Sequence, residues 1–115
     1  MEITKVNIRQ YRSDPIEVVE AKGEIDIINI DSFKQPLLAA ADLSGDLVID
    51  MREVYYIDSA GLEVLINVYT KRARNNKPFA ILVKKGSQPD EVLHIVHFHT
   101  LTRITSDPSE VGLEI

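Results

Sequence analysis

Four consecutive residues, Asp58, Ser59, Ala60 and Gly61, place a carboxylate and a hydroxyl beside two small side chains where an apolar run gives way to a helical pattern. Aspartate and serine are both strong helix N-cap residues, so a helix is predicted to begin here. Capping does not account for Gly61, because glycine inside a helix costs about 1 kcal/mol relative to alanine. We interpret this small-residue first turn as accessible backbone that another protein can approach closely.

Ser59 is spaced by four residues from Glu63, which is spaced by four from Asn67. Residues four apart share one face of a helix, so the serine is expected to be exposed at the head of a polar stripe. A phosphate on Ser59 would add about −1.5 to −2 charges, and helix N-termini tolerate anions through their free N–H groups. Phosphorylation is therefore predicted to alter an interface at the helix start and to leave the domain folded.

Three alternative chemistries fit the sequence less well. His94, His97 and His99 lie close in the sequence, but no carboxylate is clearly placed to complete a zinc site, so packing and surface roles are favoured. Asp50, near the end of the run "DLVIDM", resembles the phosphate acceptor of a receiver domain, although "NIRQYRS" lacks the acidic pair that would hold magnesium. A serine hydrolase at Ser59 is disfavoured because the G-x-S-x-G elbow is missing. No catalytic residue, metal or cofactor is predicted.

The elements that would position Ser59 follow from periodicity and turn residues. Residues 2–10 and 16–22 are predicted to form a strand hairpin around "RSDP". Residues 46–51 form a short apolar run typical of a central strand buried on both faces. A helix is predicted over residues 31–43, between the hairpin and this central strand. Pro36 should either bend the helix or mark its start.

The second half of the chain continues the alternation of helices and strands. We predict a helix over residues 59–75, a strand over 79–84, a helix capped by Ser87, an edge strand at 103–105 and a closing helical turn capped by Asp107. In the helix over 59–75 one face should pack, with Leu62, Leu65, Ile66 and Tyr69, while the other is wet.

This alternation predicts an α/β fold, a single domain over residues 1–115 with a mixed four- to five-stranded sheet and helices packed against it. Ligand and partner sites in such folds gather at the carboxyl ends of the strands. The segments "GEID", "IDMRE" and "IDSAG" are all expected at that end, so function is predicted there.

The composition of the chain argues against nucleic-acid binding and against a membrane protein. A net charge of −5 argues against non-specific nucleic-acid binding, and the one basic cluster, "KRARNNK" at residues 71–77, is interpreted as a solvated helix end. The chain has no cysteine, no leader-like N-terminus and no apolar run near the ~18 residues of a membrane span. A cytoplasmic protein without membrane contact is predicted.

The motifs "GEID" at 23–26 and "LVIDMREVYYIDSAGLEVL" at 47–65 resemble those of STAS domains of the anti-sigma factor antagonist family. The family has a strand ending in aspartate, then an acidic residue, serine, a small residue, glycine and leucine at a helix start. The resemblance implies that Ser59 is the phosphorylated serine and that Asp26 and Asp58 flank it. It also implies a partner-binding surface, made of Asp26, Asp58, Ser59, Ala60, Gly61, Glu63 and Asn67.

The resemblance further implies the partners and the cycle. The unphosphorylated protein would bind an anti-sigma factor that is also a serine kinase, which would phosphorylate Ser59 and be released. A metal-dependent serine phosphatase would then restore the serine, so catalysis would belong to the partners. The family also includes unphosphorylated modules of transporters and of other signalling complexes, which is the alternative reading.

Overall fold

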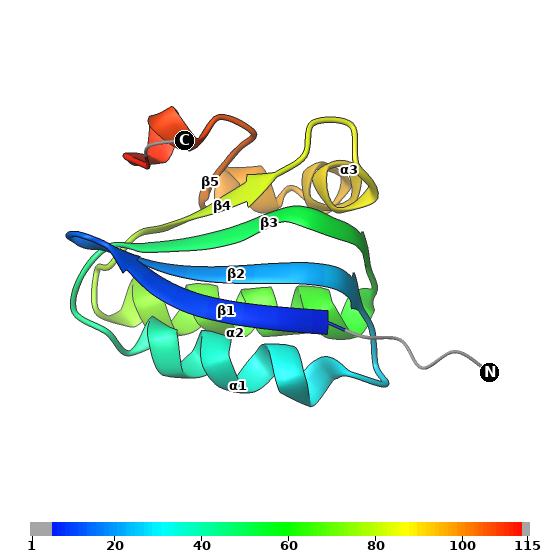
Figure 1. Ribbon diagram of the computed structural model, residues 1–115, viewed down its shortest axis with the longest axis horizontal. Helices are drawn as coiled ribbons and strands as arrows, with labels where there is room; N and C mark the ends of the chain where they lie inside the picture. The colour runs from blue at the N-terminus through cyan, green and yellow to red at the C-terminus, as the bar shows by residue number, and fades with distance from the viewer. Residues whose placement is uncertain (1–5, 114–115) are drawn as a thin grey trace.

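The computed structural model describes residues 6–113, in which five strands form a single sheet and the helices alternate with them (Figure 1). In chain order the elements are β1 (Val6–Ser13), β2 (Ile16–Ile25), α1 (Ile30–Ala41), β3 (Leu47–Ile57), α2 (Ser59–Arg74), β4 (Phe79–Val83), α3 (Gln88–Ile95), the 3-10 helix η1 (Phe98–Thr100), β5 (Arg103–Thr105) and the 3-10 helix η2 (Pro108–Val111). The predicted strand residues 2–5 lie outside the described part of the chain.

The strands lie in the order β1-β2-β3-β4-β5. β1 pairs antiparallel with β2, from Val6 opposite Gly23 to Ser13 opposite Ile16, which confirms the predicted hairpin. The pairs β2·β3, β3·β4 and β4·β5 are parallel. The sheet is therefore mixed, with β3 at its centre and β5 at one edge, as the sequence pattern predicted.

Helices α1 and α2 lie side by side against one face of the sheet (Figure 1). The main core forms between them and that face, where the strands contribute alternate apolar side chains such as Ile49 and Ile81. The opposite face carries a smaller apolar cluster, which includes Val18, Val48 and Leu82 and is covered in part by Leu113. Packing of the two helices on the sheet thus fixes where the start of α2 lies.

Strand β3 is longer than predicted, because it continues through Glu53 to Ile57 and not only to residue 51. Its pairing with β2 shifts register in two places, and these irregularities turn Val54 and Ile57 toward the helix-covered core. A strict two-residue alternation would not bring both into that core. The segment "IDMRE" therefore lies within a strand, and the expectation that it follows the strand end was wrong.

Pro36 lies inside α1, which begins at Ile30, so the alternative that the helix starts only at Pro36 was wrong. A proline within a helix costs about 3 kcal/mol. Phe33 and Leu37 are fully buried from this helix against the core, and each such side chain stabilises the fold by about 1.5–3 kcal/mol. Tertiary packing outweighs the local cost of the proline.

The basic cluster at residues 71–77 is not simply a solvated helix end, because Arg72 is only 1% exposed. Its guanidinium donates to the carbonyl oxygens of Leu43 at 2.9 Å, Gly45 at 2.8 Å and Pro78 at 2.8 Å. Burial lowers the pKa of Arg72 below its ordinary value, yet an arginine stays protonated in proteins. The arginine ties the end of α2 to the loops before β3 and β4.

Candidate functional site

The helix α2 begins at Ser59 and is capped by Asp58. One carboxylate oxygen of Asp58 accepts hydrogen bonds from the backbone N–H groups of Ala60 at 3.0 Å and Gly61 at 3.2 Å. The other oxygen accepts from the N–H of Ile27 at 3.0 Å, in the loop that joins β2 to α1. Asp58 therefore holds together the two segments that form this end of the molecule.

The β2–α1 loop is stabilised by hydrogen bonds within it that centre on Asp26. The Asp26 carboxylate accepts from the backbone N–H groups of Ile28 at 2.9 Å and Asn29 at 3.3 Å. The Asn29 side chain in turn accepts from the N–H of Asp26 at 3.0 Å and donates to the carbonyl of Glu24 at 2.7 Å. Asp26 thus fixes the conformation of the β2–α1 loop, and Asp58 hydrogen-bonds to that loop through the N–H of Ile27. The two predicted aspartates therefore lie on neighbouring segments, the β2–α1 loop and the start of α2.

Ser59 is exposed at the first position of α2. Among residues 6–113 its hydroxyl has no hydrogen-bond partner. The two N–H groups that a phosphate on this residue could use, those of Ala60 and Gly61, are already bonded to Asp58. A phosphate here would lie close to the Asp58 carboxylate and would extend away from the domain. The helix start therefore stabilises an anion less than the sequence suggested.

A groove of about 140 Å³ runs between the starts of α1 and α2 beside Ser59. It brings together three of the predicted partner-binding residues, Ala60, Glu63 and Asn67, with Ile27 and residues of α1 that the sequence did not point to. The α1 residues are Ile30, Asp31 and Lys34. The groove therefore brings three predicted site residues of α2 together with residues of α1 and of the β2–α1 loop at one end of the molecule.

The sequence reasoning missed two apolar residues at this end. Ile27 is 70% exposed and Ile28 is 75% exposed, in the apolar run "IDIINI" that lies between the predicted strand over 16–22 and the predicted helix over 31–43. The available signal was Asp26, which breaks the run and bends the chain out of the sheet. Two adjacent exposed isoleucines beside Asp58 provide apolar area that a protein partner can bury.

Gly61 has a different role from the one predicted. It is buried, and a Cβ atom at this position would overlap Cγ1 of Ile57 and would lie 2.9 Å from Cγ2 of Ile25. Real Cβ atoms essentially never approach other heavy atoms this closely. The glycine lets α2 start in contact with the ends of β2 and β3, and the interpretation of Gly61 as accessible backbone was wrong.

A second residue that the sequence reasoning missed is Gln88, the first residue of α3. Its side-chain oxygen accepts from the N–H of Ile57 at 2.9 Å, and its side-chain nitrogen donates to the carbonyl of Ile57 at 2.9 Å. Strand β4 has ended at Val83, so the amide takes the place of a neighbouring strand. Gln88 thereby anchors the residue that precedes Asp58 and Ser59.

The receiver-like alternative is wrong for this chain. Asp50 lies within β3 and is 2% exposed, and its carboxylate forms an ion pair of 2.8 Å with Arg52. A buried, paired carboxylate is not available to accept phosphate. The flavodoxin-like receiver sheet has the order 2-1-3-4-5, whereas β1 here is an antiparallel edge strand.

The three histidines lie close together where α3 ends and η1 begins, with His97 between the two elements. The rings of His94 and His99 stack with centroids 4.7 Å apart, and those of His97 and His99 are 5.8 Å apart. Nδ1 of His94 lies 2.8 Å from the carbonyl oxygen of Asp90. Within residues 6–113 no group of three or more histidine, cysteine, aspartate or glutamate side chains has the geometry to hold a metal ion.

The family model for the STAS domain matches residues 7–110. The chain belongs to the STAS domain family. The match covers the sheet, the three helices and the Asp58–Ser59 helix start, as the sequence motifs indicated. In the part of the STAS chain that the structure describes, no helix has the length and apolar character needed to cross a bilayer.

Solved structures share the fold of this STAS domain at low sequence identity. An anti-sigma factor antagonist from Mycobacterium paratuberculosis matches with a TM-score of 0.84 and 21% identity, over 93% of this chain and 91% of that one. An anti-sigma-factor antagonist (STAS) domain protein from Planctomyces limnophilus matches with a TM-score of 0.74 and 18% identity, over 90% and 92%. The unphosphorylated form of the antagonist SpoIIAA matches with a TM-score of 0.71 and 10% identity, over 95% and 100%.

Proposed function

We propose that this STAS domain is an anti-sigma factor antagonist, a non-catalytic protein-binding module that is switched by phosphorylation of Ser59. The observation that carries the proposal is the exposed, unbonded Ser59 hydroxyl at the start of α2, beside the exposed side chains of Ile27 and Ile28. Several proteins of the same fold are described as anti-sigma factor antagonists, and one is described in its unphosphorylated form. These descriptions support the proposal.

In the unphosphorylated state, the surface around Ser59 binds an anti-sigma factor that is a serine kinase. Ile27 and Ile28 supply apolar area, while Glu63 and Asn67 supply polar contacts along α2. Asp26 and Asp58 hold the loop and the helix start in place. Gly61 acts from beneath this surface and makes no direct contact.

Phosphorylation of Ser59 places about −1.5 to −2 charges beside Asp58 and at the head of the stripe that carries Glu63. The amides of Ala60 and Gly61 already donate to Asp58, so they are not free to bond the phosphate. An interface that covers this point then suffers repulsion and steric exclusion. A penalty of about 3 kcal/mol lowers affinity roughly 150-fold, and a metal-dependent serine phosphatase restores binding.

The test compares Ser59→Ala and Ser59→Asp with the native chain, using an anti-sigma factor kinase captured with the protein from its native cell. The Ala variant should bind the kinase yet accept no phosphate from ATP, and the Asp variant should bind at least tenfold more weakly with an unchanged melting temperature. Binding is measured by calorimetry and the phosphorylated residue by mass spectrometry.

Two results would contradict the proposal. Phosphate mapped to another residue would remove Ser59 from the mechanism. Binding of a partner without any phosphate transfer, and with equal affinity for the Asp variant, would instead assign the domain to a signalling or transport complex that works without phosphorylation.

A further inference from the structure

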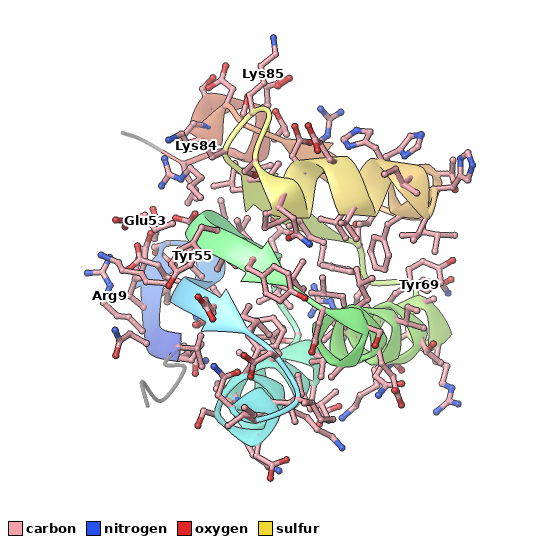
Figure 2. The ribbon with its side chains drawn as sticks, turned by 90° about the vertical axis from the view of Figure 1, so that its right-hand side faces the viewer. Arg9, Glu53, Tyr55, Tyr69, Lys84 and Lys85 are labelled. Atoms are coloured by element: carbon pink, nitrogen blue, oxygen red, sulfur yellow. The ribbon has the colours of Figure 1, made fainter. Side chains whose placement is uncertain are left out.

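A second cleft, of about 490 Å³, lies beyond the end of β4. Its walls are residues 52–55 of β3 on one side and residues 84–88, the β4–α3 loop and the first residue of α3, on the other. Figure 2 shows Lys84 and Lys85 on that loop, with Glu53 and Tyr55 on the strand below them. This basic cleft, as we call residues 52–55 and 84–88, is separate from the groove beside Ser59.

The lining of the basic cleft is positively charged, although the chain as a whole has a net charge of −5. Arg52 is paired with the Asp50 carboxylate at 2.8 Å and Glu53 with Lys22 at 3.0 Å, which leaves Lys84 and Lys85 as the cations that the lining offers to a ligand. Within residues 6–113 neither lysine ammonium group has a hydrogen-bond or ion-pair partner. Unpaired cations around a cleft of an acidic protein favour an anionic ligand.

The shape of the basic cleft favours an extended ligand. Within residues 6–113, β3 and β4 pair only as far as Met51 opposite Val83 and the Gln88 amide takes the place of a strand only at Ile57, so residues 52–55 of β3 have no strand beside them on that side. Four residues of strand span about 13 Å. An open strand edge of this kind accepts a peptide in extended conformation, which adds backbone hydrogen bonds as a further strand would.

The start of α3 does not offer a cradle for a phosphate. The N–H group of Asp90 donates to the Ser87 hydroxyl at 3.4 Å and that of Glu91 to the Ser87 carbonyl at 3.0 Å, while the loop N–H of Gly86 donates to the Asp90 carboxylate at 2.9 Å. Pro89 has no N–H group, and the Asp90 carboxylate itself places negative charge at this helix end. The anion recognised here must be one that lysine side chains alone can bind.

We propose that the basic cleft binds an extended acidic segment of a protein partner. The segment pairs its backbone with the open edge of β3 beyond Met51, and its carboxylates face Lys84 and Lys85. The exposed side chain of Tyr55 provides apolar area at one end of the cleft. This interaction goes beyond the Ser59 switch and does not require that Ser59 be phosphorylated, so either proposal can fail without the other.

The probe is a capped six-residue peptide of alternating glutamate and valine, titrated into the full, ¹⁵N-labelled chain. Amide shifts should change at residues 52–55 and 84–88, and a peptide with lysine in place of glutamate should give no saturable change. The double variant Lys84→Glu, Lys85→Glu should weaken binding of the acidic peptide at least tenfold. The matched control, Arg74→Glu with Lys77→Glu, makes the same change in net charge at the end of α2 and should leave the affinity within twofold.

Thermal denaturation of both double variants confirms that each is folded before its affinity is interpreted. Shift changes confined to other residues would overturn the proposal, as would an equal loss of affinity in the two double variants, which would mean that only net charge matters. Pyrophosphate that displaced the peptide and reproduced its shifts at the same concentration would show a site for small anions and would also overturn it.

Discussion

At the scale of single residues, the helix start at Ser59 depends on what lies beneath it. Glycine is a poor helix residue, but any larger side chain at position 61 would collide with Ile57 and Ile25. Asp58 then satisfies both the helix amides and the N–H of Ile27. The start of α2 has a low intrinsic helix propensity, but it is stabilised by packing under Gly61 and by the hydrogen bonds of Asp58.

Replacing Gly61 by alanine should therefore lower the free energy of unfolding by about 1–3 kcal/mol, because the core must shift to admit the added methyl group. Chemical denaturation measures the change. Gly45→Ala is the matched control, since a Cβ there would meet only the Pro15 carbonyl at 3.4 Å and should cost little. Equal stability of the two variants would show that the contact under Gly61 relaxes freely.

At the scale of elements, the Ser59 site is an assembly of three connections around the ends of β2 and β3. The β2–α1 loop contains Ile27, whose N–H donates to Asp58. Helix α2 begins at Ser59, and the Gln88 side chain of α3 hydrogen-bonds to the backbone of Ile57. Gln88 occupies the place where β4 would lie if it were longer. The position of Ser59 thus depends on a helix that follows it by nearly thirty residues in the sequence.

Gln88→Glu tests this connection with almost no change in shape. The new carboxylate can still accept from the N–H of Ile57 but cannot donate to its carbonyl, and it sets a charge against that oxygen. Amide hydrogen exchange at Ile57, Ala60 and Gly61 should become at least fivefold faster. The control Gln35→Glu, exposed on α1, should leave these rates unchanged.

Unchanged exchange in Gln88→Glu would mean that α2 holds the end of β3 without help from α3. A rise in exchange over the whole sheet would point instead to a general loss of stability. The positioning role requires that the change be confined to the residues near Ser59.

At the scale of the whole molecule, α1 and α2 cover one face of the sheet (Figure 1), and the partner surface that we propose lies at the end where both helices start. Ile27 and Ile28 are exposed there and contribute little to the core. Their replacement should therefore separate binding from stability, because the free energy of folding does not depend on burying them.

The double variant Ile27→Ser, Ile28→Ser should keep its melting temperature within about 2 °C and should bind the anti-sigma factor kinase at least tenfold more weakly. Ile95→Ser is the control, because Ile95 is similarly exposed, at 74%, but lies at the far end of α3. Equal affinity of the native and double-variant chains would remove the two isoleucines from the partner surface.

Local chemistry in the sequence determined the hairpin, the start of α2 at Ser59, the capping of α3 by Ser87 and the mixed α/β arrangement. These features rest on turn residues, caps and apolar periodicity, which act over a few residues. The motifs around Asp26 and Ser59 also indicated the family, which the match over residues 7–110 confirmed.

Only the tertiary structure decided the features that depend on distant neighbours. The burial of Arg72 needs carbonyl groups from two loops, the burial of Gly61 needs Ile25, and the anchoring of Ile57 needs Gln88 from α3. The course of α1 through Pro36 likewise depends on core packing that outweighs local preference. Residue spacing reports which side chains share a face of one element, whereas these contacts join elements whose relative placement is set by burial of the common core.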